Sequence, residues 1–391
     1  MPVSNPAKPV HNVRFGPQAV ADFGAVDEGE AATVDVLAND RATNAASLWS
    51  LNQSDPSAYT AEGATITLAS GATVRFDGGR IVYDAGSAFD FLMLGETATD
   101  TFTYAIRMAN GTISYTTVTM TVTGTNSPPV ANPDALASDE DAIAMVSVLG
   151  NDTDPDGDPI SVTGASLTSG LGSVSVVGNQ VVFDPLDNYN HLAAGESETV
   201  TIAYTIADDQ GGTAASTITI EITGTNDGPN AVDDSGTIDE NGSLVIAVMD
   251  NDSDPDTSDV ITVTSVGVPA MGGASLDGFG NVVFDTNGEF DWLGEGESTT
   301  VTFDYTIEDG NFATDTATVS VLVTGVNDGP DAVDDSTTAT ETGTTTLDVL
   351  ANDSDPDATD TLTITGFSQP LEGSITLDSF GNFVFDPGST F

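Results

Sequence analysis

The stretch Val301-Thr302-Phe303-Asp304-Tyr305-Thr306-Ile307 alternates apolar and polar residues. A period of two places the apolar side chains on one face of an extended strand and the polar side chains on the other. The same alternation occurs in residues 101–106 and 200–206. No segment carries an apolar stripe of helical period over a convincing length. We therefore predict an all-β protein.

The alternating strands belong to a larger repeat of about 100 residues. The joint Thr223-Gly224-Thr225-Asn226 has counterparts at residues 123–126 and 324–327, and a Pro/Gly segment follows each copy. This spacing is typical of immunoglobulin-like Greek-key β-sandwiches. We predict a linear array that consists of an irregular leader (1–19), three sandwich units (20–126, 127–226 and 227–327) and an incomplete fourth unit (328–391).

The fourth unit lacks its last strands. Residues 386–391 correspond to residues 285–290 of the third unit, and nothing corresponds to the third unit's later strands. One interpretation is that the sequence is a piece of a longer array. The other is that a second chain supplies a strand by β-addition, with residues 10–15 of the leader as the donor.

The chain is extremely acidic. It has 61 acidic and six basic residues, a formal net charge of -55, and no Lys or Arg after Arg107. Internal salt bridges cannot neutralise these acids, so they repel one another or bind cations from solution. We expect no nucleic-acid binding, which needs Lys and Arg. The chain has no cysteine and no apolar run of membrane-spanning length, so we expect no disulfide and no membrane insertion.

Many of the acids lie in one repeated loop, Asn-Asp-x-Asp-Pro-Asp, which begins at Asn151, Asn251 and Asn352. Alternate carboxylates in a turn can converge on one point, and such oxygen ligands suit Ca²⁺. In the second unit the loop also copies the opening of an EF-hand calcium loop, without the glutamate at position twelve. The candidate ligands are Asp152, Asp154, Asp156, Asp158, Asp252, Asp254, Asp256, Asp259, Asp353, Asp355, Asp357 and Asp360.

An alternative interpretation is that these loops are solvated turns, which Asp and Pro favour. Against it, three like charges within five residues repel each other, and no neighbouring Lys or Arg relieves the repulsion. In the first unit the corresponding loop reads Asp40-Arg41-Ala42, so the later aspartates are missing. We expect that loop to bind Ca²⁺ weakly or not at all.

Together these patterns resemble the VCBS and cadherin-like repeats of large secreted bacterial adhesins. The resemblance covers residues 20–391 and also rests on Gly-Glu-Ser-x-Thr-Val at residues 195–200 and 296–301. It implies cadherin-like sandwiches, Ca²⁺ as the cofactor, a role in cell adhesion or biofilm, and an extracellular or cell-surface location reached by type I secretion.

The resemblance also implies further metal ligands, because cadherins hold Ca²⁺ between successive domains with acids from both. By position in the repeat they are the joint residues Asn226, Asp227, Asn327 and Asp328, the early glutamates Glu240 and Glu341, and the loop pair Asp208 and Asp209.

Three functions remain open, none of them enzymatic, because neither His11 nor His191 lies in a nucleophile motif. The first is a Ca²⁺-rigidified adhesin segment. The second is a Ca²⁺-dependent polysaccharide-binding module, in which Trp49 of a first-unit insertion contacts the ligand. The third is a filament subunit joined by strand donation. The expected partners are calcium ions with a polysaccharide, another cell-surface protein or a second copy of the chain.

Overall fold

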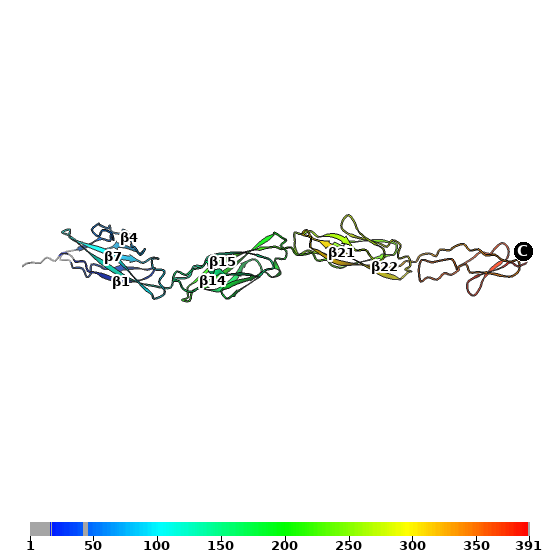
Figure 1. The fold of residues 1–391 in the computed structure, drawn as a ribbon, viewed down its shortest axis with the longest axis horizontal. Coiled ribbons are helices and arrows are strands. Elements are labelled where there is room, and N and C mark those ends of the chain that lie inside the picture. The colour runs from blue at the N-terminus through cyan, green and yellow to red at the C-terminus, as the bar shows by residue number, and fades with distance from the viewer. Residues whose placement is uncertain (1–15, 17, 42–45, 390–391) are drawn as a thin grey trace, which may run out of the picture. The chain divides into compact units, whose positions relative to one another are not determined.

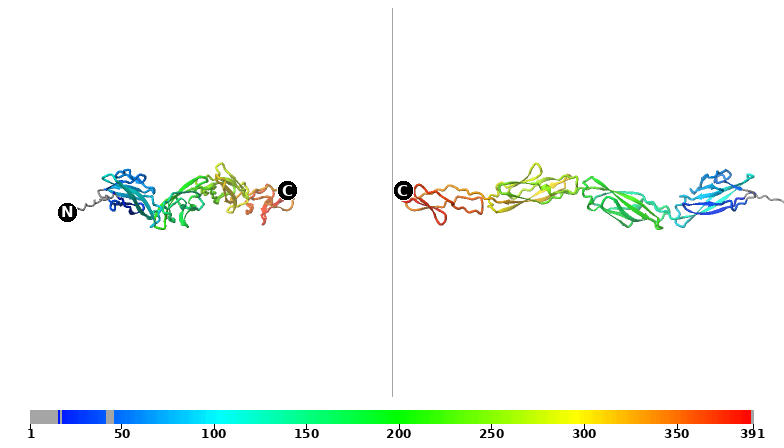
Figure 2. Two further views of the ribbon diagram at one scale, coloured as in Figure 1. Left: turned by 60° about the vertical axis from the view of Figure 1, so that its left-hand side comes forward. Right: turned by 180° about the vertical axis from the view of Figure 1, so that it is seen from behind.

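The structure is a computed structural model that describes residues 16, 18–41 and 46–389. The described residues form β-strands and three 3₁₀ turns, η1 (Val148–Gly150), η2 (Leu186–Asn188) and η3 (Val248–Asp250). The predicted all-β architecture is confirmed, and every repeat consists of extended strands joined by loops (Figures 1 and 2). The proposed donor strand 10–15 and His11 lie outside the described residues.

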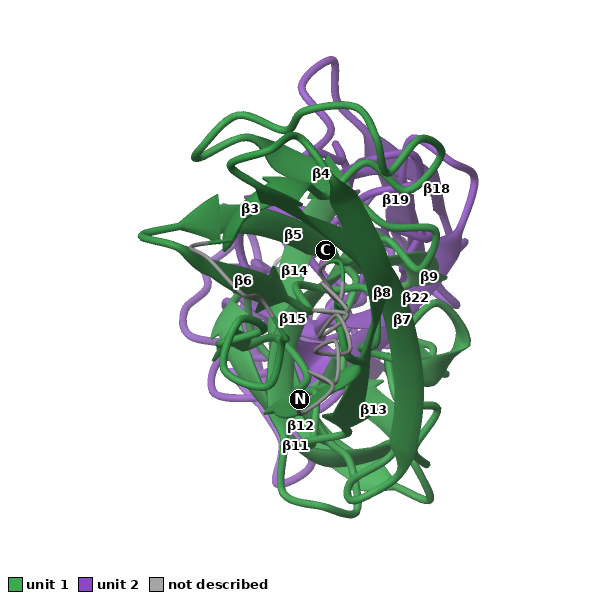
Figure 3. Cartoon of the chain, turned by 90° about the vertical axis from the view of Figure 1, so that its left-hand side faces the viewer, with its two compact units in different colours: residues 1–186, 198–222 green, residues 187–197, 223–391 purple. Residues whose placement is uncertain are grey.

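The chain divides into two compact units, residues 1–186 with 198–222, and residues 187–197 with 223–391 (Figure 3). The first compact unit contains repeat 1 and most of repeat 2, and the strands of these repeats form two sheets each. In repeat 1 one sheet has the strand order β1 (Asp22–Asp27), β8 (Ile113–Thr123), β7 (Thr97–Met108), β3 (Ala46–Ser50). The other sheet has the order β2 (Ala31–Val34), β6 (Arg80–Asp84), β5 (Thr73–Asp77), β4 (Thr65–Thr67). In repeat 2 the four-stranded sheet has the order β11 (Ser161–Ser169), β14 (Ser197–Ala207), β15 (Thr213–Thr223), β9 (Asp134–Asp139). The three-stranded sheet has the order β10 (Ala144–Val146), β13 (Gln180–Asp184), β12 (Ser173–Val177).

The second compact unit contains repeats 3 and 4. Repeat 3 has the sheets β16 (Asp234–Asp239), β22 (Thr314–Thr324), β21 (Ser298–Glu308), β18 (Thr262–Val266), and β17 (Ser243–Ile246), β20 (Val282–Asp285), β19 (Gly273–Leu276). In repeat 4 the described strands form one sheet, β23 (Thr345–Leu347), β25 (Phe383–Asp386), β24 (Ser374–Leu377). Its apolar residues Phe383 and Phe385 are half-buried, whereas Phe284 of repeat 3 is fully buried.

The alternating stretch that predicts the fold forms β21 and fills the core of repeat 3. Its apolar residues Phe303, Tyr305 and Ile307 are buried, and Phe303 stacks on Phe284 of the other sheet with ring centroids 5.9 Å apart. The intervening threonines and Asp304 face outward because successive side chains of a strand point to opposite faces. Burial of this face against a second sheet is what holds each sandwich together.

The first and last strands of a repeat pair in parallel. In repeat 1 the pairing ends with Asp27 beside Thr123, and in repeat 3 with Asp239 beside Thr324. Because parallel strands end at the same edge of a sheet, the residue after the first strand lies where the chain leaves the repeat. These residues are Glu28 and Glu240.

A buried tyrosine fixes the start of the Asn-Asp loop in repeats 1 to 3. The hydroxyl of Tyr305 lies 2.9 Å from the Oδ1 atom of Asp252 and 3.0 Å from the carbonyl oxygen of Val232. The same Oδ1 atom accepts the backbone N–H of Val232 at 2.8 Å. Asp152 with Tyr204 and Asp40 with Tyr104 repeat this arrangement. The first aspartate of the loop motif therefore anchors the loop to the core and to the entering chain.

We predict that Tyr305→Phe destabilises repeat 3 by about 1–3 kcal/mol, because the half-buried carboxylate of Asp252 loses its hydroxyl donor. Hydrogen exchange of the β21 amides should become faster. Tyr115→Phe is the control, since that side chain is 65% exposed and removal of its hydroxyl should change nothing. Equal exchange rates in the wild type and in Tyr305→Phe would contradict the anchoring role.

Candidate metal centres at the repeat boundaries

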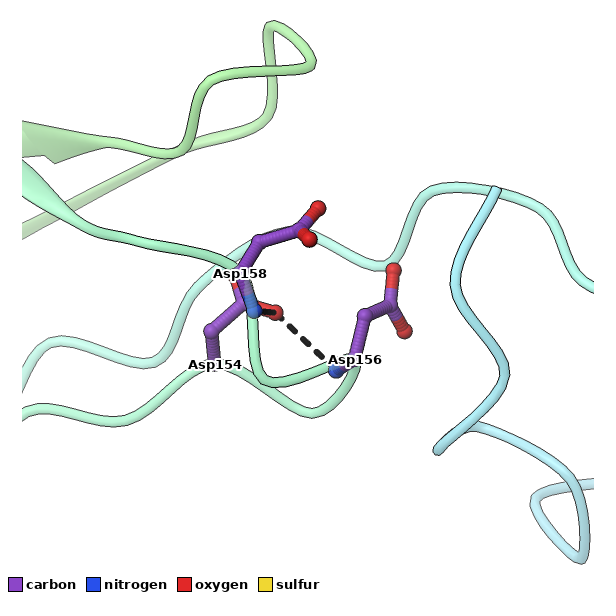
Figure 4. A group of neighbouring side chains, drawn as sticks. All are labelled: Asp154, Asp156 and Asp158. Carbon is purple, nitrogen blue, oxygen red and sulfur yellow. Dashed lines mark hydrogen bonds between the residues drawn. The ribbon is translucent and has the colours of Figure 1, made fainter. Parts of the chain in front are cut away.

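Three aspartates converge in the acidic loop of repeat 2. Asp154, Asp156 and Asp158 each offer a carboxylate oxygen, and these oxygens lie within 4.8 Å of one another (Figure 4). The loop folds on itself, because the backbone N–H groups of Asp156 and Asp158 donate to the Oδ1 atom of Asp154 at 2.9 and 3.3 Å. One oxygen of each carboxylate is buried and has no hydrogen-bond partner among the described residues.

Side chains from both repeats accept hydrogen bonds from the joint between repeats 1 and 2. The Oε1 atom of Glu28 accepts the backbone N–H of Thr125 at 2.8 Å and its hydroxyl at 3.1 Å. The Oδ2 atom of Asp156 accepts the backbone N–H of Ser127 at 2.8 Å. Glu28 and Asp156 are 5% and 4% exposed, and the second oxygen of each has no hydrogen-bond partner in the described part of the chain. Two buried carboxylates, one from each repeat, thus hold the joint at Thr125 and at Ser127.

The electrostatics of this boundary disfavour bare carboxylates. Burial raises the pKa of Glu28, and the charges of Asp156 and Asp90 raise it further. Burial also raises the pKa of Asp158, with contributions from Asp209 and Asp154. No Lys or Arg follows Arg107 in the sequence, so repeat 2 has no cationic side chain of its own that is permanently charged.

Asp208 connects the joint to a second loop. Its Oδ1 atom accepts three backbone N–H groups, from Gln210, Gly211 and Gly212, at 2.9, 2.6 and 2.8 Å. Its Oδ2 atom accepts the side-chain amide of Asn126 at 3.0 Å, and this bond above all lowers the pKa of Asp208. The Oδ1 atom of Asn126 is buried without a hydrogen-bond partner among the described residues and remains able to bind a cation.

Repeat 3 builds the same loop. The backbone N–H of Asp227 donates to the Oδ2 atom of Asp256 at 3.0 Å, and Asn226 donates to Asp309 at 2.9 Å. Asp256 is 1% exposed, and burial raises its pKa to about 6, helped by the charges of Asp227, Asp254 and Asp259.

The boundary between repeats 3 and 4 carries two linked groups. Carboxylate oxygens of Glu240, Asp328 and Asp357 lie within 4.8 Å of one another, and so do those of Asp355, Asp357 and Asp360. The backbone N–H of Val326 donates to Glu240 at 2.9 Å, and that of Asp328 donates to Asp357 at 3.0 Å. Asp357 belongs to both groups and is 2% exposed. At this boundary Glu240 and Asp357 therefore accept backbone hydrogen bonds from the joint, as Glu28 and Asp156 do at the first joint.

Not every expected ligand lies in these groups. Asp152, Asp252 and Asp353 are turned to the entering chain, where each accepts a backbone N–H. Asp209 and Glu341 are exposed. The indole of Trp49 lies on β3, among side chains of repeat 1. The other expected positions belong to the loops and joints described above: Asp154, Asp156, Asp158, Asp208, Asn226, Asp227, Glu240, Asp254, Asp256, Asp259, Asn327, Asp328, Asp355, Asp357 and Asp360.

Sequence reasoning missed four acids that the structure adds to these boundaries: Glu28, Asp90, Asp291 and Asp309. Asp291 raises the pKa of both Glu240 and Asp328, and its own Oδ1 atom is buried without a partner in the described residues. A signal for it exists, because Phe89-Asp90 and Phe290-Asp291 occupy equivalent places in repeats 1 and 3. Glu28 likewise matches Glu240 in the repeat.

Profiles of known families match most of the chain beyond repeat 1. Residues 226–325 match the bacterial cadherin-like domain, and residues 126–221 and 327–391 match the bacterial Ig domain. Repeats 2 to 4 are bacterial cadherin-like and Ig-like domains. These domain types indicate an extracellular adhesion-type repeat protein, and no catalytic family is indicated. No curated protein matches the chain.

Solved cadherin structures overlap with much of the chain at low sequence identity. Protocadherin Gamma B2 domains 1–5 give a TM-score of 0.46 at 12% identity over 94% of this chain and 72% of that one. Mouse cadherin-23 EC22–24 gives 0.43 at 15% identity over 79% and 98%. The protocadherin GammaB4 extracellular domain gives 0.49 at 14% identity over 96% and 61%. The family profiles, not these overlaps, identify the domains. Among the described residues, none of the helical segments has the length and apolar character needed to cross a membrane.

The donor sets at the boundaries fit Ca²⁺. They consist of carboxylate and side-chain amide oxygens, which are among the ligands that this hard cation prefers. The buried oxygens of Glu28, Asp156, Glu240 and Asp357 that lack a partner in the described chain are those that a cation would satisfy. Buried carboxylates without a counter-charge are costly, so a bound divalent cation would remove an unfavourable contribution to folding.

We predict that without divalent cations repeat 3 loses stability as the pH rises. The pKa of Asp256 is about 6 in the folded state and about 3.8 in the unfolded chain, so between these values the folded state binds more protons. Stability should fall between about pH 4 and pH 6, by on the order of 2–3 kcal/mol. Thermal unfolding in EGTA across this range measures the slope. In Asp256→Asn the slope should be smaller, and a wild type that gains stability with pH would contradict the assignment.

Proposed function

We propose that the chain is a Ca²⁺-binding repeat segment of a secreted or cell-surface adhesin or biofilm matrix protein, in which bound Ca²⁺ stiffens the boundaries between repeats. The observation that supports it most is the grip of Glu28 and Asp156 on the joint residues Thr125 and Ser127. Each carboxylate uses one oxygen on the joint and keeps one buried oxygen without a partner among the described residues.

At the first boundary Glu28, Asp154, Asp156 and Asp158 would hold the ion, with Asp90 and Asn126 as further donors. At the boundary of repeats 3 and 4 the corresponding acids are Glu240, Asp291, Asp355 and Asp357. A bound Ca²⁺ would supply the positive charge that repeats 2 to 4, which have no Lys or Arg, lack. The protein's part is to position the oxygens, and the hydrogen bonds to the joint fix two of them in each case.

The ion would stiffen the joint because the carboxylates that bind the ion also accept the hydrogen bonds from the joint residues. Without a cation, repulsion between Glu28 and Asp156 favours separation of the two repeats and loss of the hydrogen bonds at Thr125 and Ser127. A ligand that binds only the closed joint stabilises it by RT ln(1 + [L]/Kd), about 2.7 kcal/mol at a hundredfold excess. In calcium-poor cytosol the joints would stay loose, which suits export by type I secretion, and in calcium-rich surroundings they would close.

We expect millimolar Ca²⁺ to raise the melting temperature of the full chain by several degrees or more relative to EGTA, because ions bind only the folded boundaries. Equal Mg²⁺ should have a smaller effect, since Mg²⁺ requires a compact octahedral site and dehydrates reluctantly. Circular dichroism against temperature measures both shifts. A melting temperature that is the same in Ca²⁺ and EGTA would show that the acidic loops are solvated turns.

The double variant Glu28→Gln/Glu240→Gln should lose most of this Ca²⁺-dependent shift while it keeps the fold, because glutamine preserves the shape and removes the charge. Glu372→Gln is the matched control: its side chain is exposed and lies in none of the acidic groups, so its shift should equal that of the wild type.

We further predict that Ca²⁺ narrows the range of distances across a boundary. Spin labels in repeats 1 and 2, placed on exposed Thr117 and Glu198, should give a broad distance distribution in EGTA and a narrow one in Ca²⁺ when measured by pulsed electron resonance. The Glu28→Gln variant should stay broad in both. Identical distributions with and without Ca²⁺ would contradict stiffening, even if the ion binds.

A further inference from the structure

One face of repeat 1 is built differently from its counterparts. At the edge of its first sheet the pairing of β3 with β7 shifts between Leu48 and Ser50, which leaves Trp49 as the extra residue of a β-bulge. The pairing of β18 with β21 in repeat 3 shifts in the same way between Val263 and Ser265 and leaves Thr264. Trp49 and Thr264 therefore occupy equivalent positions, and bulges of this kind re-aim side chains.

The difference extends across the neighbouring strands. In repeat 3 the outward positions are filled by Thr264, Glu308, Thr314 and Thr316, as is usual for a solvated sheet face. In repeat 1 the register places Trp49, Arg107, Ile113 and Tyr115 at these positions. Because repeat 3 forms the same sheet with threonines and a glutamate, the fold does not require the aromatic residues, the isoleucine or the arginine.

The side chains of this face are fixed in place. The guanidinium carbon of Arg107 lies 4.1 Å from the centre of the Trp49 ring. The ring centroids of Tyr59 and Trp49 are 4.9 Å apart, and the two ring planes are tilted relative to each other. The indole N–H donates to the carbonyl oxygen of Ser57 at 2.8 Å. The loop that carries Tyr59 and Ser57 is tied to β7 by Gln53, which exchanges two hydrogen bonds with the backbone of Thr103. The cation–π contact thus holds the guanidinium in one position.

Two hollows lie beside this cluster. One, of about 470 Å³, is lined by Trp49 and Arg107, and the other, of about 500 Å³, by Pro56, Ile113 and Tyr115. They are neighbours, because Arg107 and Ile113 are directly paired across β7 and β8. The rings of Tyr59 and Tyr115 are 62% and 65% exposed. The face therefore offers two adjacent hollows with exposed aromatic rings and one cation.

The charge of Arg107 indicates the ligand. Among the described residues the ion pairs are those of Arg75 with Asp77 and of Arg80 with Asp35, so Arg107 has no carboxylate partner there, although the chain has 61 acids. A guanidinium that lies on an aromatic ring still presents N–H groups at its edge, and these fit a carboxylate in two-pronged fashion. Exposed tyrosine rings fit the flat apolar faces of pyranose sugars.

We propose that this face of repeat 1 binds a uronic-acid-containing polysaccharide, with Arg107 on a sugar carboxylate and with Tyr59 and Tyr115 under sugar rings. Two hollows in a row suit an extended chain of sugars, each of which carries the same carboxylate. Trp49 positions Arg107. This binding uses no residue of the Ca²⁺ boundaries, so it does not depend on the function proposed above.

The test is calorimetric titration of the full 391-residue chain with tri-galacturonic acid in EGTA. The wild type should bind, and it should bind maltotriose, which has no carboxylate, at least about tenfold more weakly. Arg107→Glu and Tyr115→Thr give repeat 1 the residues of repeat 3 and should each weaken binding by about tenfold or more. Arg75→Glu and Phe279→Thr are the controls and should bind as the wild type does, since Arg75 and the 92% exposed Phe279 lie elsewhere.

Equal binding of maltotriose, or unchanged binding in Arg107→Glu, would overturn the proposal. It would also be overturned if a hexa-aspartate peptide displaced the sugar at equal concentration, because the site would then recognise acidic protein segments. Circular dichroism of each variant separates loss of binding from loss of fold. If Tyr115→Thr fails to fold, Arg107→Lys decides the matter: it keeps the charge, loses the planar fork and should bind more weakly than the wild type.

Discussion

The parallel pairing of the first and last strands of a repeat is the constraint on which the boundaries depend. It brings the end of β1 beside the end of β8, so that Glu28 lies beside the residues through which the chain leaves. The same pairing of β16 with β22 places Glu240 beside Val326. An antiparallel pairing would put these glutamates at the far end of the sandwich. The position of the early glutamate is therefore a consequence of sheet topology, and the acidic loop of the next repeat meets it there.

The β-architecture could be predicted from the sequence because a strand that is buried on one face has alternating apolar and polar residues. Residues 301–307 show this period and do form a buried strand. The convergence of Asp154, Asp156 and Asp158 was also predictable, since they are close in sequence and the loop closes by short-range hydrogen bonds. Local patterns are sufficient for features of this kind.

Contacts between distant residues could not be predicted in the same way. Asp252 has the same motif as its neighbours, yet the hydroxyl of Tyr305, 53 positions away, gives it an anchoring role. Asp291 lies outside the acidic loop motif and shares only a Phe-Asp pair with repeat 1, and it raises the pKa of Glu240 from a distant part of the sequence. For Trp49 the sequence indicated an exposed contact residue, and in the structure it is half-buried and contacts Arg107 and Tyr59. The pairing of strands decides each case, and composition does not reveal it.

The double use of Asp156 links chemistry to mechanical force. One of its oxygens holds the backbone of Ser127, and the other is free to take part in ion binding. Coupling of two events through one group is reciprocal, so whatever strengthens one must strengthen the other. Tension that draws Ser127 away from Asp156 would lower the affinity of the boundary for its ion, and a bound ion would raise the load at which the boundary opens. Under tension, an array built in this way would open first at the boundary with the lowest Ca²⁺ occupancy. The calcium concentration around the cell would then set the tensile strength of the array.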